Sequence, residues 1–261
     1  MGQYKIPATL AELFEYSVQE YSDQTFTGFA DGTTCYTYAQ FGAKTREISQ
    51  LMSRYGIGSK DKVVILSENT PNYSVVLFAT VAFDRVMVPV LPDCSENEVS
   101  NILTHSEAKA AFASTAQLSK ISKEHMDALS LVVNMTTFEV VKGDLFDGEV
   151  ELSTPKPDDM VAVLYTSGTS GNAKGVMLSH RNLCHNLVGI PDLFEVGPDF
   201  RFLSILPIAH TYEMSIGLLF PIATGSSVYY LGKTSRRPKL PVTRINYSHY
   251  RDDFAFTNGQ W

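Results

Sequence analysis

The sequence has few cysteines and no long apolar run, and each shortage excludes a class of protein. Its three cysteines, Cys35, Cys94 and Cys184, are scattered, with no CxxC pair and no His/Cys cluster at zinc-ligand spacing. This argues against a disulfide scaffold and a structural zinc site. No run approaches the roughly 18 apolar residues of a membrane helix. The first residues, MGQYKIPATLAELFEYS, lack the apolar core of a signal peptide. A cytoplasmic location is therefore expected, with peripheral membrane contact left open.

The sequence also has no excess of basic over acidic residues. The net charge is −7 and the sequence pI is about 5.4, so binding to nucleic acid through its phosphates is not expected. This overall balance does not exclude a local positive patch. With 44% hydrophobic and 19% charged residues, the 261-residue chain has the composition of a globular protein with a core. The sequence carries no signal for an oligomeric state.

Short apolar runs alternate with helical patterns along the chain. Strands are expected at 62–67, 86–90, 110–113, 131–134 and 161–165, with helices at 73–82, 96–106 and 115–129. Ahead of them, Thr9 is expected to cap a helix through about residue 21, followed by a hairpin at 25–29 and 35–38 and a helix at 41–54. Residues 142–158 are acidic and are interpreted as a surface connection. The alternation predicts an α/β fold of parallel-rich sheets with helices on both faces.

A glycine-rich loop follows the strand at 161–165. From Tyr165 to Gly175 the chain reads YTSGTSGNAKG. Gly168 and Gly171 permit positive φ, so that successive N–H groups can form an anion nest. Lys174 adds a point charge for phosphate oxygens.

Hydroxyl groups complete the predicted phosphate site. Thr166, Ser167, Thr169 and Ser170 supply further donors and one potential magnesium ligand. A flexible surface linker is the alternative, but the buried-type strand before the loop and the fixed place of Lys174 favour phosphate binding. The Walker A pattern fails, because Ala173 and Gly175 stand where that pattern requires Gly and Ser or Thr.

The loop resembles the signature of the adenylate-forming (AMP-binding) superfamily. That signature is close to YTSGTTGxPKGV followed by SH, and this chain has YTSGTSGNAKGVMLSH, with Ser170 for Thr and Ala173 for Pro. The segments YTYAQF, SENTPNY and VPVLPDCSENEVSNILTHSEAKAAF also resemble the amino-terminal half of the superfamily. FDRV at 83–86 departs from it, because a glycine usually stands near Asp84. The string LPIAHTYE from residue 206 looks most like the long-chain fatty-acid branch.

The resemblance, over roughly residues 8–234, implies an activity. A fatty acid would react with Mg-ATP to give an acyl-adenylate, and CoA would then give acyl-CoA. Thr166 would assist magnesium, residues 167–171 (Ser167, Gly168, Thr169, Ser170 and Gly171) with Lys174 would hold the β- and γ-phosphates, and His210 would lie beside the α-phosphate and the carboxylate. His210 and Lys174 are thus the catalytic candidates. The alternatives are an aryl, short-chain or amino acid as substrate, or a non-catalytic binding module.

Nearby polar residues are given structural roles. His180, Cys184 and His185 lie on a predicted helix after Ser179 and are interpreted as packing or capping residues. Glu213 is given no more than a structural or channel-lining role.

The sequence changes character near residue 235. Residues 235–261 carry five basic and two acidic side chains and show no helical or strand period. No YGxTE or TGD string, which the family uses for adenine and ribose, occurs. We therefore expect a partial amino-terminal AMP-binding domain over 1–234, an unrelated or frameshifted tail over 235–261, no carboxyl-terminal domain, and little or no turnover by this chain alone.

Overall fold

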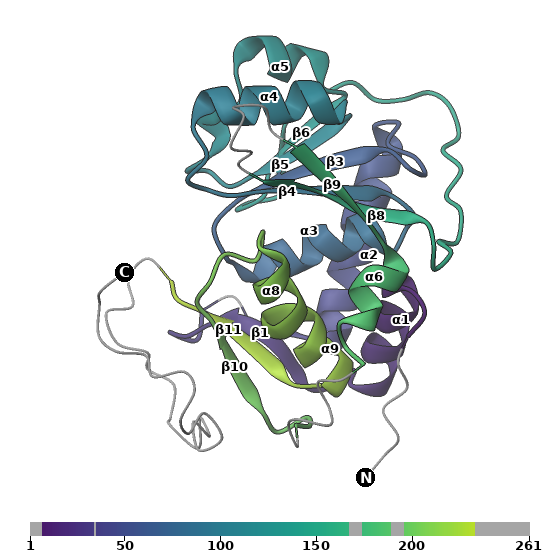
Figure 1. Cartoon of the computed structure of the whole chain (residues 1–261), viewed down its shortest axis with the longest axis vertical. Helices are drawn as coiled ribbons and strands as arrows, with labels where there is room; N and C mark the ends of the chain where they lie inside the picture. Colours follow the sequence, from purple (N-terminus) through teal and green to yellow (C-terminus); the bar gives the residue numbers. More distant parts are fainter. Residues whose placement is uncertain (1–6, 34, 167–173, 189–195, 233–261) are drawn as a thin grey trace.

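The computed structural model describes residues 7–33, 35–166, 174–188 and 196–232. Two sheets enclose a layer of helices (Figure 1). Within the described ranges, no helix has the length and apolar character needed to cross a bilayer.

Seven described strands form the larger sheet, in the order β7-β6-β5-β3-β4-β8-β9. In chain order they are β3 (Lys62–Leu66), β4 (Val86–Val90), β5 (Ala110–Ala113), β6 (Leu131–Asn134), β7 (Glu139–Gly143), β8 (Met160–Thr166) and β9 (Lys174–Ser179). The five central strands, β6-β5-β3-β4-β8 in spatial order, pair in parallel. At the edges, β7 is antiparallel to β6 and β9 is antiparallel to β8. The predicted α/β class with a parallel-rich sheet is confirmed.

Helices cover both faces of this sheet. Figure 1 shows α4 (Glu96–Ser106) and α5 (Lys123–Ala128) on the outer face and α3 (Pro71–Val81) on the inner face. Beside α3 lie α1 (Leu10–Glu20) and α2 (Tyr38–Arg54). The Thr9 side chain caps α1 as predicted, by accepting a hydrogen bond from the Glu12 N–H. Helix α2 begins earlier than expected, because Thr37 and Gln40 form a capping box.

The smaller sheet has the order β10-β11-β1-β2 among the described strands. Its members are β1 (Thr25–Phe29), β2 (Tyr36–Thr37), β10 (Arg201–Ser204) and β11 (Ser227–Tyr230). Strands β1 and β2 are antiparallel, which confirms the predicted hairpin. The helical segments associated with this part of the chain are α6 (His180–His185), α8 (Thr211–Glu213), a π-helical segment (Met214–Leu219) and α9 (Phe220–Thr224).

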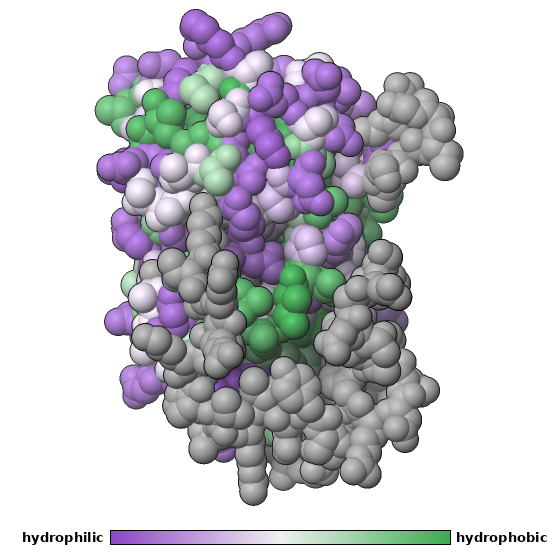
Figure 2. Space-filling model, turned by 90° about the vertical axis from the view of Figure 1, so that its left-hand side faces the viewer, coloured by the Kyte–Doolittle hydropathy of each residue, from purple (hydrophilic) through white to green (hydrophobic). Residues whose placement is uncertain are grey.

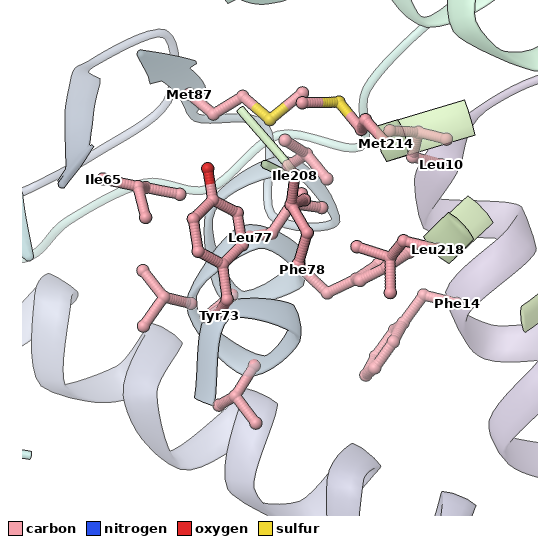
Figure 3. Packing of buried hydrophobic residues seen from close by; sticks show 14 of the residues in the cluster. Leu10, Phe14, Ile65, Tyr73, Leu77, Phe78, Met87, Ile208, Met214 and Leu218 are labelled. Carbon is pink, nitrogen blue, oxygen red and sulfur yellow. The ribbon is translucent and has the colours of Figure 1, made fainter. Parts of the chain in front are cut away.

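The core lies between the two sheets around α3, which is buried along almost its whole length. Figure 3 shows Tyr73, Leu77 and Phe78 of α3 between side chains of the larger sheet and those of α1 and the 208–218 segment. Because α3 has no polar face, it is stable only as an internal helix.

One predicted helix is wrong. The single helix expected at 115–129 is a short 3₁₀ turn, Leu118–Lys120, followed by α5. The Ser122 side chain accepts a hydrogen bond from the His125 N–H and so starts a new helix. Strand β7 overlaps the start of the predicted surface connection, and its residues are exposed or half-buried.

The departure from the family pattern at FDRV has a structural explanation. Asp84 has a φ of +62°, the left-handed conformation that glycine adopts without strain and that aspartate tolerates. Its carboxylate accepts a 2.5 Å hydrogen bond from the Lys60 ammonium group. Asp84 therefore adopts a backbone conformation that favours glycine, and its carboxylate is accommodated by the contact with Lys60.

Candidate functional site

The predicted phosphate loop spans the turn of an antiparallel hairpin. Thr166 is the last residue of β8 and Lys174 the first of β9, and the two are direct cross-strand partners. Ser167, Gly168, Thr169, Ser170 and Gly171 lie outside the described residues. The described part thus places the two ends of the loop side by side, with Thr166 and Lys174 bracketing residues 167–173.

This hairpin leaves the sheet at the edge where the parallel strands end. Strands β3, β4 and β8 are parallel neighbours, so their carboxyl ends share one edge. In open α/β sheets this edge is the usual location of ligand sites. The Tyr165 hydroxyl lies 2.8 Å from Nδ1 of His105 on α4, which anchors the end of β8 to the outer helical layer.

Lys174 is exposed and available to an anionic ligand. Among the described residues, the ion pairs are made by other basic side chains, and no carboxylate pairs with Lys174. No group of three or more His, Cys, Asp or Glu suited to a metal ion occurs in the same ranges.

His210 lies between two buried anchors. Ile208 and Met214 are both buried, and Figure 3 shows them within the core around α3. The His210 side chain is exposed at the start of α8. Its N–H donates to the Pro207 carbonyl at 2.9 Å, and its carbonyl accepts from the Met214 N–H at 2.9 Å. The backbone of His210 is therefore fixed while its imidazole stays accessible.

The His210 segment meets the same sheet edge. Asn69 follows the end of β3 and hydrogen bonds to Leu206 and Ile208. Both parts of the site proposed from the sequence, the loop after β8 and the His210 segment, are thus attached to the carboxyl edge of the larger sheet. The pattern of the sequence did not reveal Asn69, since its partners lie far along the chain.

Glu213 is buried beneath this segment. Its Oε1 accepts a 2.5 Å hydrogen bond from the Ser204 hydroxyl, and burial raises the pKa of its carboxyl group. These contacts join the end of β10 to α8 and fit the structural role expected for Glu213.

His180 and Cys184 have the packing and capping roles predicted for them. His180 is buried, and its Nδ1 accepts a 3.1 Å hydrogen bond from the N–H of Leu10 at the first turn of α1. This satisfies one of the amide groups that a helix start leaves without a partner. Cys184 is also buried, which raises the pKa of its thiol to about 12. His185 lies exposed on the same helix.

The buried His180 predicts a loss of stability in mild acid. Burial lowers the pKa of His180 from 6.5 to about 4. The charges of Asp84 and Asp159 act to raise this pKa, and the charge of Lys60 acts to lower it further. Between these values the unfolded state binds more protons, so the free energy of unfolding falls as the pH drops from 6.5 to 4, by up to about 3 kcal/mol. Urea unfolding across this range measures the effect.

A matched pair of variants tests this assignment. His180→Asn keeps an acceptor for the Leu10 N–H but does not titrate, so its stability is expected to vary less between pH 6.5 and 4. His185→Gln changes an exposed histidine on the same helix and should keep the wild-type profile. An unaltered profile in His180→Asn would assign the acid sensitivity to other groups.

The comparisons with known proteins identify the family. A family profile described as "AMP-binding enzyme" matches residues 14–248. The chain belongs to this family. Among solved structures, ATP-bound MatB from Rhodopseudomonas palustris has a TM-score of 0.70 at 24% identity, covering 85% of this chain and 45% of that chain. The N-terminal domain of FACL13 from Mycobacterium tuberculosis has a TM-score of 0.72 at 18% identity, and the match covers 92% of this chain and 60% of that chain. These likenesses show that the fold is that of AMP-binding enzymes.

Curated relatives of the family differ in the acid that their names specify. The peroxisomal long chain acyl-CoA synthetase 7 of Arabidopsis thaliana is 28% identical over 248 residues, which cover 83% of this chain and 35% of that protein. Sulfoacetate–CoA ligase of Cupriavidus necator is 26% identical, and the match covers 44% of that protein. The chain spans about a third to a half of the length of these relatives.

Proposed function

We propose that this site serves the ATP-dependent activation of a fatty acid, first to an acyl-adenylate and then to acyl-CoA. The observation that carries the proposal is the hairpin closed by Thr166 and Lys174 at the carboxyl edge of the larger sheet, with the His210 segment attached to that edge. An anion site and an accessible imidazole at one edge suit a reaction between a carboxylate and a triphosphate.

The proposed chemistry needs no activated serine or cysteine, because the carboxylate is already a nucleophile. Its oxygen forms a bond to the α-phosphorus, the bond from that phosphorus to the bridging oxygen breaks, and pyrophosphate leaves. In the second step the CoA sulfur bonds to the acyl carbon, the bond to AMP breaks, and the thiol proton passes to solvent. Catalysis then depends on positioning and on stabilisation of charge.

Each site residue has a defined part in this proposal. Residues 167–171 and Lys174 hold the β- and γ-phosphates, so that part of the negative charge on the leaving pyrophosphate is compensated. Thr166 would supply its hydroxyl to a magnesium ion, which would compensate charge on the phosphates. His210 orients the carboxylate beside the α-phosphate, either by donating a hydrogen bond or by carrying a positive charge.

A panel of non-hydrolysable acyl-adenylates tests the substrate class. Acyl sulfamoyl-adenosines with dodecanoyl, benzoyl and aminoacyl groups are titrated into the chain by calorimetry. We expect the dodecanoyl compound to bind at least about tenfold more tightly, because each buried methylene contributes about 0.8 kcal/mol. Tighter binding of the benzoyl or aminoacyl compound would assign another acid to the same site. Robust fatty-acid-dependent ATP–pyrophosphate exchange would overturn our expectation that this chain alone turns over little.

A second function, association between two copies of this chain, is favoured by an exposed apolar patch. Ile205 and Leu231 are 57% and 46% exposed and extend the neighbouring parallel strands β10 and β11, whose register pairs Ser204 with Tyr230. Tyr212 on α8 is 58% exposed. Figure 2 shows a group of hydrophobic residues just below the middle of this side of the molecule. Patches of this kind are commonly interaction sites.

Light scattering after size-exclusion chromatography tests this second function. We expect concentration-dependent association that Ile205→Lys weakens. Leu145→Lys is the matched control, because Leu145 is 71% exposed but lies near β7 at the far end of the larger sheet. A monomer at every concentration would rule out self-association through the patch.

The cytoplasmic location stays a prediction, and names among the relatives include peroxisomal and chloroplastic proteins. Fatty acid, ATP and CoA are the proposed partners.

A further inference from the structure

The side-chain amide of Asn69 joins two segments that lie far apart in the sequence. Its Nδ2 donates to the Ser204 hydroxyl at 2.9 Å and to the Leu206 carbonyl at 2.6 Å. Its Oδ1 accepts from the Ile208 N–H at 2.9 Å. Every hydrogen-bonding atom of the amide is thus used on the segment that leads to His210.

The same segment is held from its other side by Glu213. The Ser204 hydroxyl that accepts from Asn69 donates to the Glu213 carboxylate, and the Ile205 N–H also hydrogen bonds to that carboxylate. The loop from Ser204 to Glu213 is therefore closed across its base. The Asn69 amide attaches this closed loop to the end of β3.

The attachment ties the His210 segment to the sheet edge at which β8 ends with Thr166. Asn69 follows β3, Thr166 ends β8, and only β4 separates these strands in the sheet. Because β4 pairs with both β3 and β8, a segment attached to the end of β3 is also placed relative to Thr166 at the end of β8. Misplacement of a reacting group by about 1 Å can lower a rate by about a hundredfold.

We propose that Asn69 is a positioning residue, which holds His210 in register with Thr166 and Lys174 at the ends of β8 and β9 without touching substrate. The proposal rests on the function proposed above for the role of His210. An amide suits the task because it donates and accepts at once, which neither a carboxylate nor an alkyl group can do. The loss of Asn69 is expected to affect the acyl-adenylate geometry more than the binding of the β- and γ-phosphates.

Asn72 provides a matched control on the next turn of the chain. Its amide donates to the carbonyls of Met135 and Thr136 and accepts from the Tyr36 hydroxyl, so it also makes three hydrogen bonds. None of these reaches the segment from 204 to 210. If the Asn69 amide had only a structural role, its replacement should therefore have the same effect as replacement of the Asn72 amide.

The experiment compares Asn69→Ala and Asn72→Ala in the full chain. The ring signals of His210, assigned with His210→Gln, are followed in carbon–proton spectra, and affinities for dodecanoyl sulfamoyl-adenosine and Mg-ATP are measured by calorimetry. In Asn69→Ala we expect the His210 signals to shift, the affinity for the analogue to fall about tenfold, and the affinity for Mg-ATP to stay within about threefold. In Asn72→Ala none of the three should change.

The outcomes separate the two proposals. If the wild-type chain does not bind the analogue, the proposed function fails, and the His210 signals still decide the role of Asn69. If the His210 signals are unchanged in Asn69→Ala, or change equally in Asn72→Ala, the positioning role is refuted. Should Asn69→Ala not fold, Asn69→Asp keeps the acceptor for Ile208 and loses the donor, and the same comparison is made with it.

Discussion

Replacing Lys174 with alanine is expected to weaken the binding of Mg-ATP about 10- to 100-fold. A hydrogen bond to a charged group contributes about 1.5–3 kcal/mol, and Lys174 stands at the exposed mouth of the hairpin with no carboxylate partner among the described residues. Calorimetry on the wild type and the variant measures the loss directly.

Lys109 is the control for this substitution. It precedes β5 and therefore lies at the opposite, amino edge of the same sheet, where it forms a 2.8 Å ion pair with Asp61. Lys109→Ala should bind Mg-ATP as the wild type does. Equal and strong binding by Lys174→Ala would refute the assignment of the phosphate loop, whereas a loss in both variants would indicate an effect of overall charge.

Replacing Arg85 with alanine is expected to lower the free energy of unfolding by about 3–5 kcal/mol. The side chain is fully buried, and its guanidinium donates to the Ile57 carbonyl at 2.9 and 3.0 Å and to the Ser49 and Ser53 hydroxyls at 2.8 Å each. It also reaches the Ala79 carbonyl of α3 at 3.2 Å. Truncation would leave a cavity. It would also leave several polar groups of α2, of α3 and of the turn at Ile57 without a hydrogen-bond partner.

The charge of Arg85 persists at neutral pH. Burial lowers its pKa to about 10, which is still well above neutrality. Arg85→Met retains part of the buried volume, so we expect it to recover some of the stability lost in Arg85→Ala. Arg181→Ala removes an exposed arginine that pairs with Asp158 at 2.7 Å and should leave the free energy of unfolding close to that of the wild type. Urea denaturation compares the three variants, and a loss below about 1 kcal/mol in Arg85→Ala would contradict the role of Arg85 as a buried junction.

The central strands could be predicted because their signal is local. Residues 86–90, 110–113 and 131–134 are short continuous apolar runs, and strands β4, β5 and β6 have these bounds. The edge strands β7 and β9 were not predicted, because their residues are largely exposed and lack such a run; Met177 of β9 is 71% exposed. An edge strand takes its conformation mainly from its hydrogen-bonded neighbour, which the local sequence does not contain.

The same distinction applies to the site. The loop residues from Thr166 to Lys174 are contiguous, so their pattern was visible in the sequence. Asn69 and Arg85 act through contacts formed only by the fold, and the sequence showed the region of Arg85 only as a departure from the family pattern. Residues 167–171 remain predictions, since they lie outside the described part of the chain.

Affinity labelling tests most directly whether the loop after β8 binds the phosphates of ATP. An adenosine polyphosphate that carries a pyridoxal aldehyde at its terminal phosphate is incubated with the chain and reduced, and the modified lysine is mapped by mass spectrometry. We predict that the label lies on Lys174 and that excess Mg-ATP prevents the labelling. Modification of other lysines with Lys174 unlabelled, or labelling of Lys174 that Mg-ATP does not reduce, would contradict the phosphate site.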